Sequence, residues 1–264
     1  MELQNKRVLL TGATGGIGQL LAAELAKRGA QLILLGRDAN RLEAVKQHIE
    51  QPQALTLVAD LADTQQLDAL QQKLTELGAV DVIINNAGKM YFGEFSQQSL
   101  SDITQLFQTN LLTPVLLTRM LLPQLLAQEQ AMVVNIGSTL GALGFPYYTT
   151  YCSSKFGLRG FSQALRRELV DTHVHILYVA PRAIQTAMNE GDNIQAMHKA
   201  TKTNVDTPEF VVAKIMQGIE KDKKEVIIGQ PEGFFSRLNG FFPNFIDMGL
   251  KKQARIMSKF VKKN

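Results

Sequence analysis

The sequence has few residues that build covalent or metal crosslinks. Its 264 residues include one cysteine, Cys152, and no tryptophan. A single thiol excludes an internal disulfide and a metal site built from cysteines, and it fits a reducing cytoplasm. We expect Cys152 to be a small packed residue, and we predict no metal site.

Two kinds of long apolar segment are also missing. The N-terminal stretch enters a strand pattern at once, without a basic region followed by a long apolar core, so we expect no secretion signal. No run reaches the ~20 apolar residues that a membrane-spanning helix needs. These absences favour a cytoplasmic protein.

Composition and charge describe a globular chain with an unusual end. Hydrophobic residues make up 45% and charged residues 20%, which excludes a disordered or fibrous class. The length fits one large domain, expected over residues 1–230, followed by a C-terminal extension over 231–264. Residues 221–264 hold ten Lys/Arg against four Asp/Glu, whereas the rest holds 18 against 20. This balance argues against nucleic-acid binding by the body and favours a separate partner for the tail.

Short apolar runs alternate with longer amphipathic segments along the chain. Seven runs have strand character: RVLLT, QLILL, ALTLVA, DVIIN, AMVVNI, HILYVA and EVIIG. Continuous apolar strands separated by helices are typical of a parallel sheet that is covered on both faces. The pattern predicts an α/β fold around a seven-stranded parallel sheet.

A glycine-rich turn, TGATGGIG, lies between the first strand and the first helix. Glycines in this position let backbone N–H groups approach a pyrophosphate at a helix N-terminus, where the helix dipole favours negative charge. The alternative is a merely tight turn. The candidate cofactor contacts in this turn are Gly12, Thr14, Gly15, Gly16, Ile17 and Gly18.

The end of the second strand bears on the choice of cofactor. An acidic side chain about 20 residues after a glycine turn would hold a ribose 2′-hydroxyl. This chain has Gly36 followed by Arg37 instead. A guanidinium pairs bidentately with a 2′-phosphate, so we predict NADP(H) in preference to NAD(H). The alternative is a solvated arginine paired with Asp38 or Glu43.

Two further turns follow strands. After the third strand come Asp60 and Leu61, and after the fourth come Asn86, Ala87 and Gly88. Ligands in open α/β sheets lie beyond the carboxyl ends of the strands, so both turns are candidate cofactor contacts. Alternatively, Asp60 only caps a helix.

A long helical pattern runs from about residue 99 to 127, with Asn110 and Pro114 in its middle. Proline removes one backbone hydrogen bond and crowds the carbonyl four residues earlier, which is that of Asn110. A kink would free this carbonyl to bind water. The pattern alone is equally compatible with Asn110 as an ordinary helix residue.

Ser138, Tyr151 and Lys155 form the strongest chemical pattern in the chain. Tyr151 and Lys155 are spaced i, i+4, so on a helix their side chains lie on one face and can meet. An ammonium favours the phenolate, which moves a tyrosine pKa from about 10 towards acid/base work near neutral pH. A serine hydroxyl held opposite would complete the set.

The set of TGATGGIG, NNAG, Asn110, Ser138, Tyr151 and Lys155 resembles the short-chain dehydrogenase/reductase family over residues 5 to about 230. Four separated motifs occur in the family's order, and the serine lies thirteen residues before the tyrosine. The resemblance implies a Rossmann-type, doubly wound sheet. It also implies hydride transfer between a nicotinamide cofactor and a carbonyl or alcohol, in a homodimer or homotetramer paired through the helices that carry Asn110 and Tyr151.

The resemblance also assigns roles. Tyr151 would be the general acid in reduction, while Lys155 would lower its pKa and hold the nicotinamide ribose. Ser138 would fix the substrate oxygen, and Asn110 would position a water on a proton relay. The glycine turn would contact the pyrophosphate, Asp60 the adenine, and the NNAG turn the adenosine ribose.

After the sixth strand the family has Pro-Gly, and this chain has Pro181-Arg182. Glycine takes backbone angles that arginine avoids, so we expect this loop to differ in detail. Thr186 matches the family's threonine near the cofactor. The candidate cofactor contacts here are Pro181, Ile184 and Thr186. Arg182 is either a surface ion pair or a partner for an anionic group on cofactor or substrate.

Apolar residues around the catalytic stretch favour a lipophilic substrate. They are Leu140, Leu143, Phe145 and Tyr148. Tyr147 and Tyr148 lack a lysine four residues later, so we interpret them as pocket walls or as ordinary packing. The candidate substrate contacts are Ser138, Leu140, Tyr148 and Tyr151.

The last two segments are less specific. Residues 187–206 are polar with scattered methionines, which fits a mobile lid, and His198 within them is expected at the surface. Five of the thirteen phenylalanines lie in residues 234–245, before the basic stretch KKQARIMSKFVKK. This tail suits contact with an anionic bilayer or the edge of a lipophilic pocket. The alternative is a helix packed on its own domain or on a second subunit.

The sequence therefore predicts an NADP(H)-dependent carbonyl reductase or alcohol dehydrogenase that acts on a lipophilic ketone or aldehyde. Two alternatives share the same fold. One is a cofactor-binding regulator or scaffold without turnover, and the other is an epimerase or dehydratase.

Overall fold

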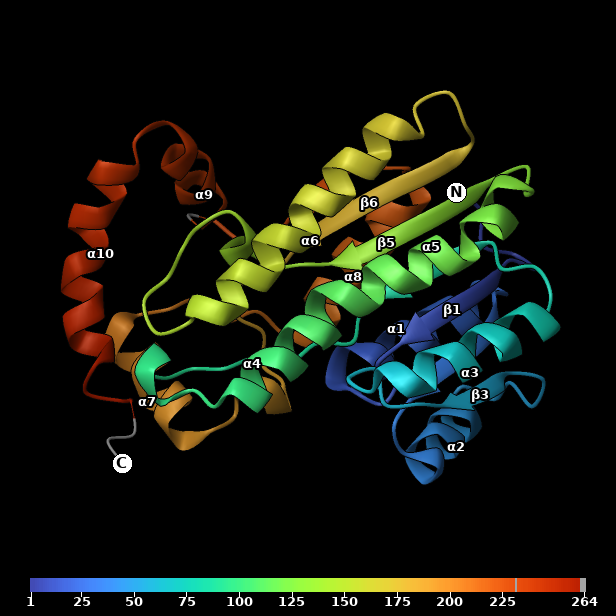
Figure 1. Cartoon of the computed structure of the whole chain (residues 1–264), viewed down its shortest axis with the longest axis horizontal. Helices are drawn as coiled ribbons and strands as arrows, with labels where there is room; N and C mark the ends of the chain where they lie inside the picture. The colour runs from blue at the N-terminus through green and yellow to red at the C-terminus, as the bar shows by residue number, and fades with distance from the viewer. Residues whose placement is uncertain (231, 262–264) are drawn as a thin grey trace.

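The computed structural model describes residues 1–230 and 232–261 (Figure 1). Lys262 and Lys263, which end the basic pattern of the tail, lie outside the described residues.

Seven parallel strands form one sheet in the order β3-β2-β1-β4-β5-β6-β7. The strands are β1 (Arg7–Thr11), β2 (Gln31–Gly36), β3 (Leu55–Val58), β4 (Val82–Asn85), β5 (Ala131–Ile136), β6 (Val174–Ala180) and β7 (Glu225–Ile227). The strand order runs outward from β1 to β3 on one side and from β4 to β7 on the other, which confirms the predicted doubly wound α/β fold. The point where the order reverses lies between β1 and β4.

Helices cover both faces of the sheet. They are α1 (Gly16–Lys27), α2 (Ala39–His48), α3 (Thr64–Glu76), α4 (Leu100–Phe107), α5 (Thr113–Leu126), α6 (Thr149–Glu168), α7 (Asp192–Thr201), α8 (Pro208–Glu220), α9 (Glu232–Phe241) and α10 (Pro243–Met257). Side chains alternate between the faces along β1, where Val8 and Leu10 pack towards α1, α2 and α8, and Leu9 packs towards α3 and α5. Strands that are buried on both sides explain the continuous apolar runs of the sequence.

The expected long helix over residues 99–127 is wrong in one respect. It is divided into α4, a π-helical turn at Gln108–Leu112, and α5. Within the turn, the N–H of Thr113 donates to the carbonyl of Gln108, five residues earlier. Pro114 has no N–H for the carbonyl of Asn110, and the wider turn accommodates this break in the helical ladder.

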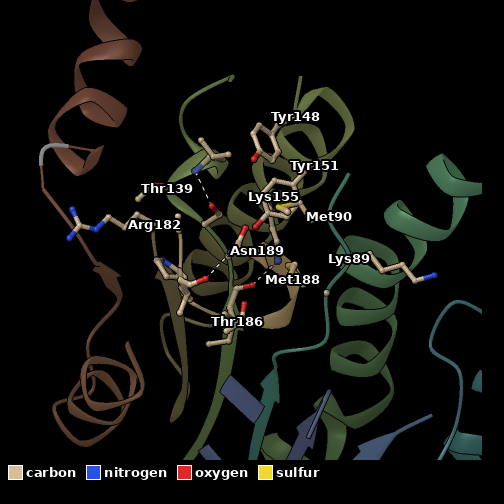
Figure 2. Close-up of a pocket in the computed structure, with 18 of the residues that line it drawn as sticks. Lys89, Met90, Thr139, Tyr148, Tyr151, Lys155, Arg182, Thr186, Met188 and Asn189 are labelled. Carbon is tan, nitrogen blue, oxygen red and sulfur yellow. Dashed lines mark hydrogen bonds between the residues drawn. The ribbon is translucent and has the colours of Figure 1, made fainter. Parts of the chain in front are cut away.

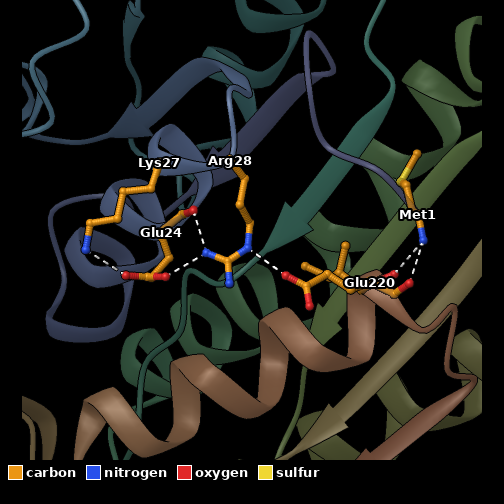
Figure 3. A network of polar contacts seen from close by, with 6 residues as sticks. Met1, Glu24, Lys27, Arg28 and Glu220 are labelled. Atoms are coloured by element: carbon orange, nitrogen blue, oxygen red, sulfur yellow. Dashed lines mark hydrogen bonds and ion pairs between the residues drawn. The ribbon is translucent and has the colours of Figure 1, made fainter.

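Polar contacts join the N-terminal segment and α1 to α8 (Figure 3). The guanidinium of Arg28 donates from Nε to Glu220 and from Nη1 to Glu24, both at 2.6 Å. The amino group of Met1 donates to the carbonyls of Ile219 and Glu220. Partly exposed ion pairs contribute at most about 1 kcal/mol each, so these contacts orient α1 more than they stabilise the fold.

The C-terminal tail packs against the body through α9 and α10, drawn in red in Figure 1. The side chain of Asn239 on α9 donates to the carbonyl of Ala142, and α10 lies against α7. Met257 is fully buried in a cluster with Tyr148, Cys152 and Met197. The side of the tail that faces the body is therefore packed on the chain's own domain, which was one of the alternatives considered from the sequence.

Candidate active site

The turn between β1 and α1 is shaped by close backbone approach. Gly12 has a φ of +64°, and a Cβ there would lie 2.8 Å from the Cα of Ala87. A Cβ on Gly18 would lie 2.1 Å from the carbonyl oxygen of Gly12. No side chain caps α1 at Gly15, so the first N–H groups of the helix keep their capacity to bind an anion. The turn therefore has the form expected of a pyrophosphate cradle.

Hydrogen bonds fasten this turn to the one after β4. The hydroxyl of Thr11 accepts from the N–H groups of Asn86 and Ala87, each at 3.0 Å. The side-chain amide of Asn86 donates to the carbonyls of Thr11 and Gly12, both at 3.1 Å. Asn86 thus joins the two turns at the point where the strand order reverses, and the role of Thr11 went unrecognised in the sequence.

Arg37 is exposed beside the cavity and makes no ion pair within the described part of the chain. Asp38, its expected alternative partner, instead caps α2 by accepting from the N–H of Arg41. The guanidinium of Arg41 reaches back to the carbonyl of Thr14 at 3.0 Å and also lines the cavity. Arg41, which lies in the first turn of α2, was missed in the sequence.

Asp60, in the turn after β3, does not cap a helix, which was one interpretation of the sequence. The carboxylate of Asp60 accepts from the N–H of Ala62 at 2.9 Å, within the turn. The N-cap of α3 is Asp63, whose side chain accepts from Gln65. The interpretation of Asp60 as a helix cap is therefore wrong, and Asp60 and Leu61 both line the cavity.

Asn110 is fully buried in the π-helical turn. Its side-chain oxygen accepts from the N–H of Lys89 at 2.7 Å, and its amide donates to the Lys89 carbonyl at 2.8 Å and to Ser154 at 3.0 Å. The interpretation as an ordinary helix residue is wrong, because the side chain fixes the segment that follows NNAG. The side chain of Lys89 points away from the pocket towards Gln105 (Figure 2).

Tyr151 and Lys155 lie one turn apart on α6 and share the cavity with Ser138 (Figure 2). The ammonium of Lys155 is 5.8 Å from the centre of the Tyr151 ring and donates to the carbonyl of Ile136 at 2.9 Å. The Ser138 hydroxyl accepts from the N–H of Leu140 and hydrogen-bonds Tyr151. The three groups predicted from spacing are therefore brought together.

Burial controls the ionisation of this pair. It raises the pKa of Tyr151 to about 12, partly offset by the hydrogen bond to Ser138. It lowers the pKa of Lys155 to about 8, because a buried ammonium loses its hydration. The sequence predicted that the pKa of Tyr151 would be lowered, and this prediction is wrong, because burial raises it. At neutral pH the phenol keeps its proton.

Arg182 forms an ion pair, as one alternative proposed, although the pair is largely buried. Its Nη2 and Nε donate to the two carboxylate oxygens of Asp206 at 2.7 and 3.0 Å, and the side chains are 17% and 8% exposed. Its Nη1 donates to the carbonyl of Gln230. The residue thereby joins the loop after β6, the start of α8 and the beginning of the tail.

The loop after β6 also contacts the glycine turn. A Cβ on Gly16 would lie 3.2 Å from the Cγ2 of Thr186. The side chain of Asn189 donates to the carbonyl of Ile184. Pro181, Ile184 and Thr186, which are candidate cofactor contacts, all line the cavity.

One cavity of about 1110 Å³ connects these parts. It is lined by every candidate cofactor and substrate residue predicted from the sequence. Of the four catalytic candidates, only Asn110 lies behind its wall. The cavity also has apolar walls from α7, α9, α10 and the loop after β6: Met188, Met197, Phe235, Phe245, Ile246, Met248 and Leu250. The tail among them was one of the pocket edges considered from the sequence.

Some of the remaining residues that the sequence singled out line the cavity, and others only pack against their neighbours. Tyr148 is buried, lines the cavity and stacks 5.1 Å from the ring of Phe92, so it is a wall. Tyr147 does not line it and meets Phe92 edge to face. Cys152 is a buried free thiol, as expected. His198 is half-buried at the cavity, where burial lowers its pKa, so the expected surface position is wrong.

Within residues 1–230 and 232–261, no group of His, Cys, Asp and Glu side chains is arranged to hold a metal ion. Over the same residues, no helix is both long enough and apolar enough to cross a bilayer.

Comparisons with known proteins agree with this geometry. A sequence profile described as short chain dehydrogenase matches residues 6–196. "Ketoacyl reductase HetN" of Nostoc sp. is 36% identical over 232 residues, which cover 86% of this chain and 80% of the relative.

Among solved structures, a short-chain dehydrogenase from Sphingobium yanoikuyae in complex with NADPH superposes with a TM-score of 0.79 at 27% identity. The match covers 92% of this chain and 95% of that one. A family member from Burkholderia phymatum in complex with NAD has a TM-score of 0.82 at 21% identity over 93% and 96% of the chains, and it shows the fold alone.

Proposed function

The chain belongs to the short-chain dehydrogenase/reductase family of oxidoreductases, and we propose that it is an NADP(H)-dependent reductase of lipophilic ketones or aldehydes, or the corresponding alcohol dehydrogenase. The observation that carries the proposal is the meeting of Ser138, Tyr151 and Lys155 in the same cavity as the glycine turn.

The residues present fit a dinucleotide. A Cβ at Gly12 or Gly18 would clash with the backbone of Ala87 or of Gly12, so glycine is needed for the close packing of this turn. The uncapped start of α1 supplies donors for a pyrophosphate, and Lys155 and Thr186 line the same wall beyond it. The cofactor would supply the hydride.

The chain's own residues would handle the proton and the substrate oxygen. The hydroxyl of Ser138 can donate to a carbonyl oxygen and hold it beside the phenol of Tyr151. Since the raised pKa keeps Tyr151 protonated at neutral pH, the phenol can give its proton to that oxygen as charge develops there. The Lys155 ammonium near the ring would stabilise the phenolate that remains.

The preference for NADP(H) is supported by two cations at the adenosine end of the cavity. Arg37 has no carboxylate partner among the described residues, and Arg41 holds the glycine turn from beside it. No acidic side chain occupies the position that would hold a ribose 2′-hydroxyl, because Gly36 stands there.

The function is tested with purified full-length protein, NADPH and a panel of ketones and aldehydes of graded chain length. We expect turnover that is at least about 10²-fold lower in Tyr151→Phe, because the proton donor is lost. Tyr147→Phe is the matched control, since this neighbouring tyrosine lies outside the cavity lining. Equal rates in Tyr151→Phe and wild type would reject the assignment. Tight NADPH binding without turnover on any substrate would instead favour a cofactor-binding regulator.

The cofactor preference has its own test. In Arg37→Ala we expect NADPH affinity to fall at least about tenfold while NADH affinity stays within twofold, because only NADPH carries the 2′-phosphate. Arg167→Ala, an exposed arginine on α6, is the control. Titration by fluorescence measures both affinities, and an unchanged ratio in Arg37→Ala would refute the preference.

A further inference from the structure

The outer side of the tail carries large apolar side chains with nothing over them. Phe241 is 80% exposed and Met248 is 70% exposed, and Phe242 and Phe245 between them are also exposed. All four lie at the corner where α9 meets α10. We call them the tail corner. Apolar side chains gathered in this way are typical of surfaces that contact another phase or molecule.

Cations continue this surface along α10. Residues 243–261 contain Lys251, Lys252, Arg255 and Lys259 against a single acid, Asp247. All four cations are exposed. Met248, Lys251 and Arg255 are spaced by three and four residues, which places them on one side of α10, and Lys259 follows shortly after the helix ends at Met257. Ile246 and Met257 point the other way and are buried against the body.

The tail corner is also the rim of the cavity. Phe245 and Met248 both line the cavity and are exposed to solvent. Phe235 and Ile246 continue the apolar lining inward. Apolar side chains therefore extend from the solvent-exposed rim along the wall of the cavity that also holds Ser138 and Tyr151.

We propose that the tail corner and the cations of residues 251–259 seat the protein on an anionic membrane surface, with the cavity rim facing the bilayer. An anionic bilayer matches both halves of this surface, because acyl chains accept aromatic and Met side chains while lipid phosphates attract lysine and arginine. A protein partner would have to combine an apolar pocket with an acidic rim. Entry of a lipophilic carbonyl from the bilayer rests on the proposed function, whereas membrane binding does not.

The test measures sedimentation of the full-length protein with vesicles. The vesicles are made of phosphatidylcholine alone or with phosphatidylglycerol. We expect binding only to the anionic vesicles, and we expect it to weaken as salt is raised. The variant Phe241→Ser/Phe242→Ser and the variant Lys251→Glu/Arg255→Glu/Lys259→Glu should each bind at least about tenfold more weakly, because one removes apolar contact and the other reverses the charge.

The controls separate this surface from general effects. Lys73→Glu/Arg167→Glu/Lys223→Glu changes the net charge equally at exposed positions outside the tail, and Val170→Ser removes an exposed apolar residue at the end of α6. Both controls should bind like wild type. NADPH affinity should be unchanged in all variants, because none of the substituted residues lines the cavity.

Three results would overturn the proposal. In the first, wild-type protein stays in the supernatant with anionic vesicles. In the second, the charge control loses as much binding as the tail charge variant. In the third, the tail variants change the oligomeric mass but not vesicle binding. The last would identify the surface as a contact between copies. Since no turnover is measured, failure here leaves the proposed reductase activity separately testable.

Discussion

At the scale of single residues, the site depends on two buried groups whose pKa values are shifted in opposite directions. Burial raises the pKa of Tyr151 to about 12 and lowers that of Lys155 to about 8. Both shifts favour the neutral form, so each group resists the charge it would carry as a phenolate or an ammonium. A proton can therefore be held on Tyr151 at neutral pH, while the charge of Lys155 is maintained at a cost.

This cost predicts a pH dependence of stability. Lys155 has a lower pKa when folded than its ordinary value of 10.5, so between about pH 8 and 10 the unfolded chain binds more protons and stability rises with pH. We expect this group to add on the order of 2 kcal/mol to the free energy of unfolding between pH 8 and 9.5. Urea unfolding of wild type and Lys155→Met at both values measures it.

In Lys155→Met the increase should be absent, since no buried ammonium remains to discharge. A parallel pH dependence in the two proteins would show that Lys155 is not the responsible group.

The side-chain and backbone contacts that the sequence predicted follow from local spacing. Tyr151 and Lys155 meet because i, i+4 is one helical turn, and Gly12 and Gly18 are needed because the backbone of one turn packs on the next. Arg41 and Asn86 were less apparent in their structural roles. Both act by reaching the backbone of a segment distant in sequence, which no local pattern specifies.

At the scale of elements, the loop after β6 is closed at its base by one ion pair. Arg182 binds Asp206 with two hydrogen bonds, and the backbone of Asp206 pairs with Ala183 and Gln185. The two ends of the segment from Thr186 to Asn204 are therefore held together. This segment includes α7 and Met197, which lines the cavity. This closure positions the cavity wall that α7 contributes.

Breaking the pair should loosen that loop. In Arg182→Ala the buried carboxylate of Asp206 loses its partner, and we expect the free energy of unfolding to fall by about 3 kcal/mol. KM for a lipophilic substrate should rise at least about fivefold, with a smaller change in kcat, since the loss is one of positioning. Urea unfolding measures the loss of stability, steady-state kinetics measures KM and kcat, and limited proteolysis reports the loosening of residues 187–204.

The matched control is Arg159→Ala, which removes a more exposed pair with Glu225 away from this loop. Arg182→Lys should recover part of the KM, because it restores one charge but not the two-pronged geometry. If Arg182→Ala and Arg159→Ala change KM alike, the positioning role is rejected.

The sequence predicted the strands of the sheet, but it did not predict the irregular turn between α4 and α5. The seven strands were identified because burial on both faces leaves apolar runs. The π-helical turn was not identified, because a period of 3.6 with one proline fits a kinked helix equally well. For the tail, the sequence offered the edge of a lipophilic pocket as one of several positions, but it did not specify which side chains of α10 would line the cavity.

At the scale of the whole molecule, the helices beside the candidate catalytic residues present apolar side chains outward. α4, the π-helical turn and α6 lie against one another. Leu100 is 83% exposed, and Leu112 and Phe156 on the neighbouring elements are also exposed. This surface is separate in sequence from the tail corner. We infer that two copies pair here, through the elements that carry Asn110 and Tyr151.

We therefore propose a homodimer, or a homotetramer built from it, that is weakened by Leu112→Asp/Phe156→Asp. Burying a carboxylate in a self-complementary contact costs several kcal/mol on each side of the two-fold axis, so this variant should elute as a monomer. Light scattering coupled to size-exclusion chromatography gives the mass. Val170→Asp, at another exposed apolar position, should keep the wild-type mass. A wild-type monomer, or a variant whose mass is unchanged, would exclude this surface as the subunit contact.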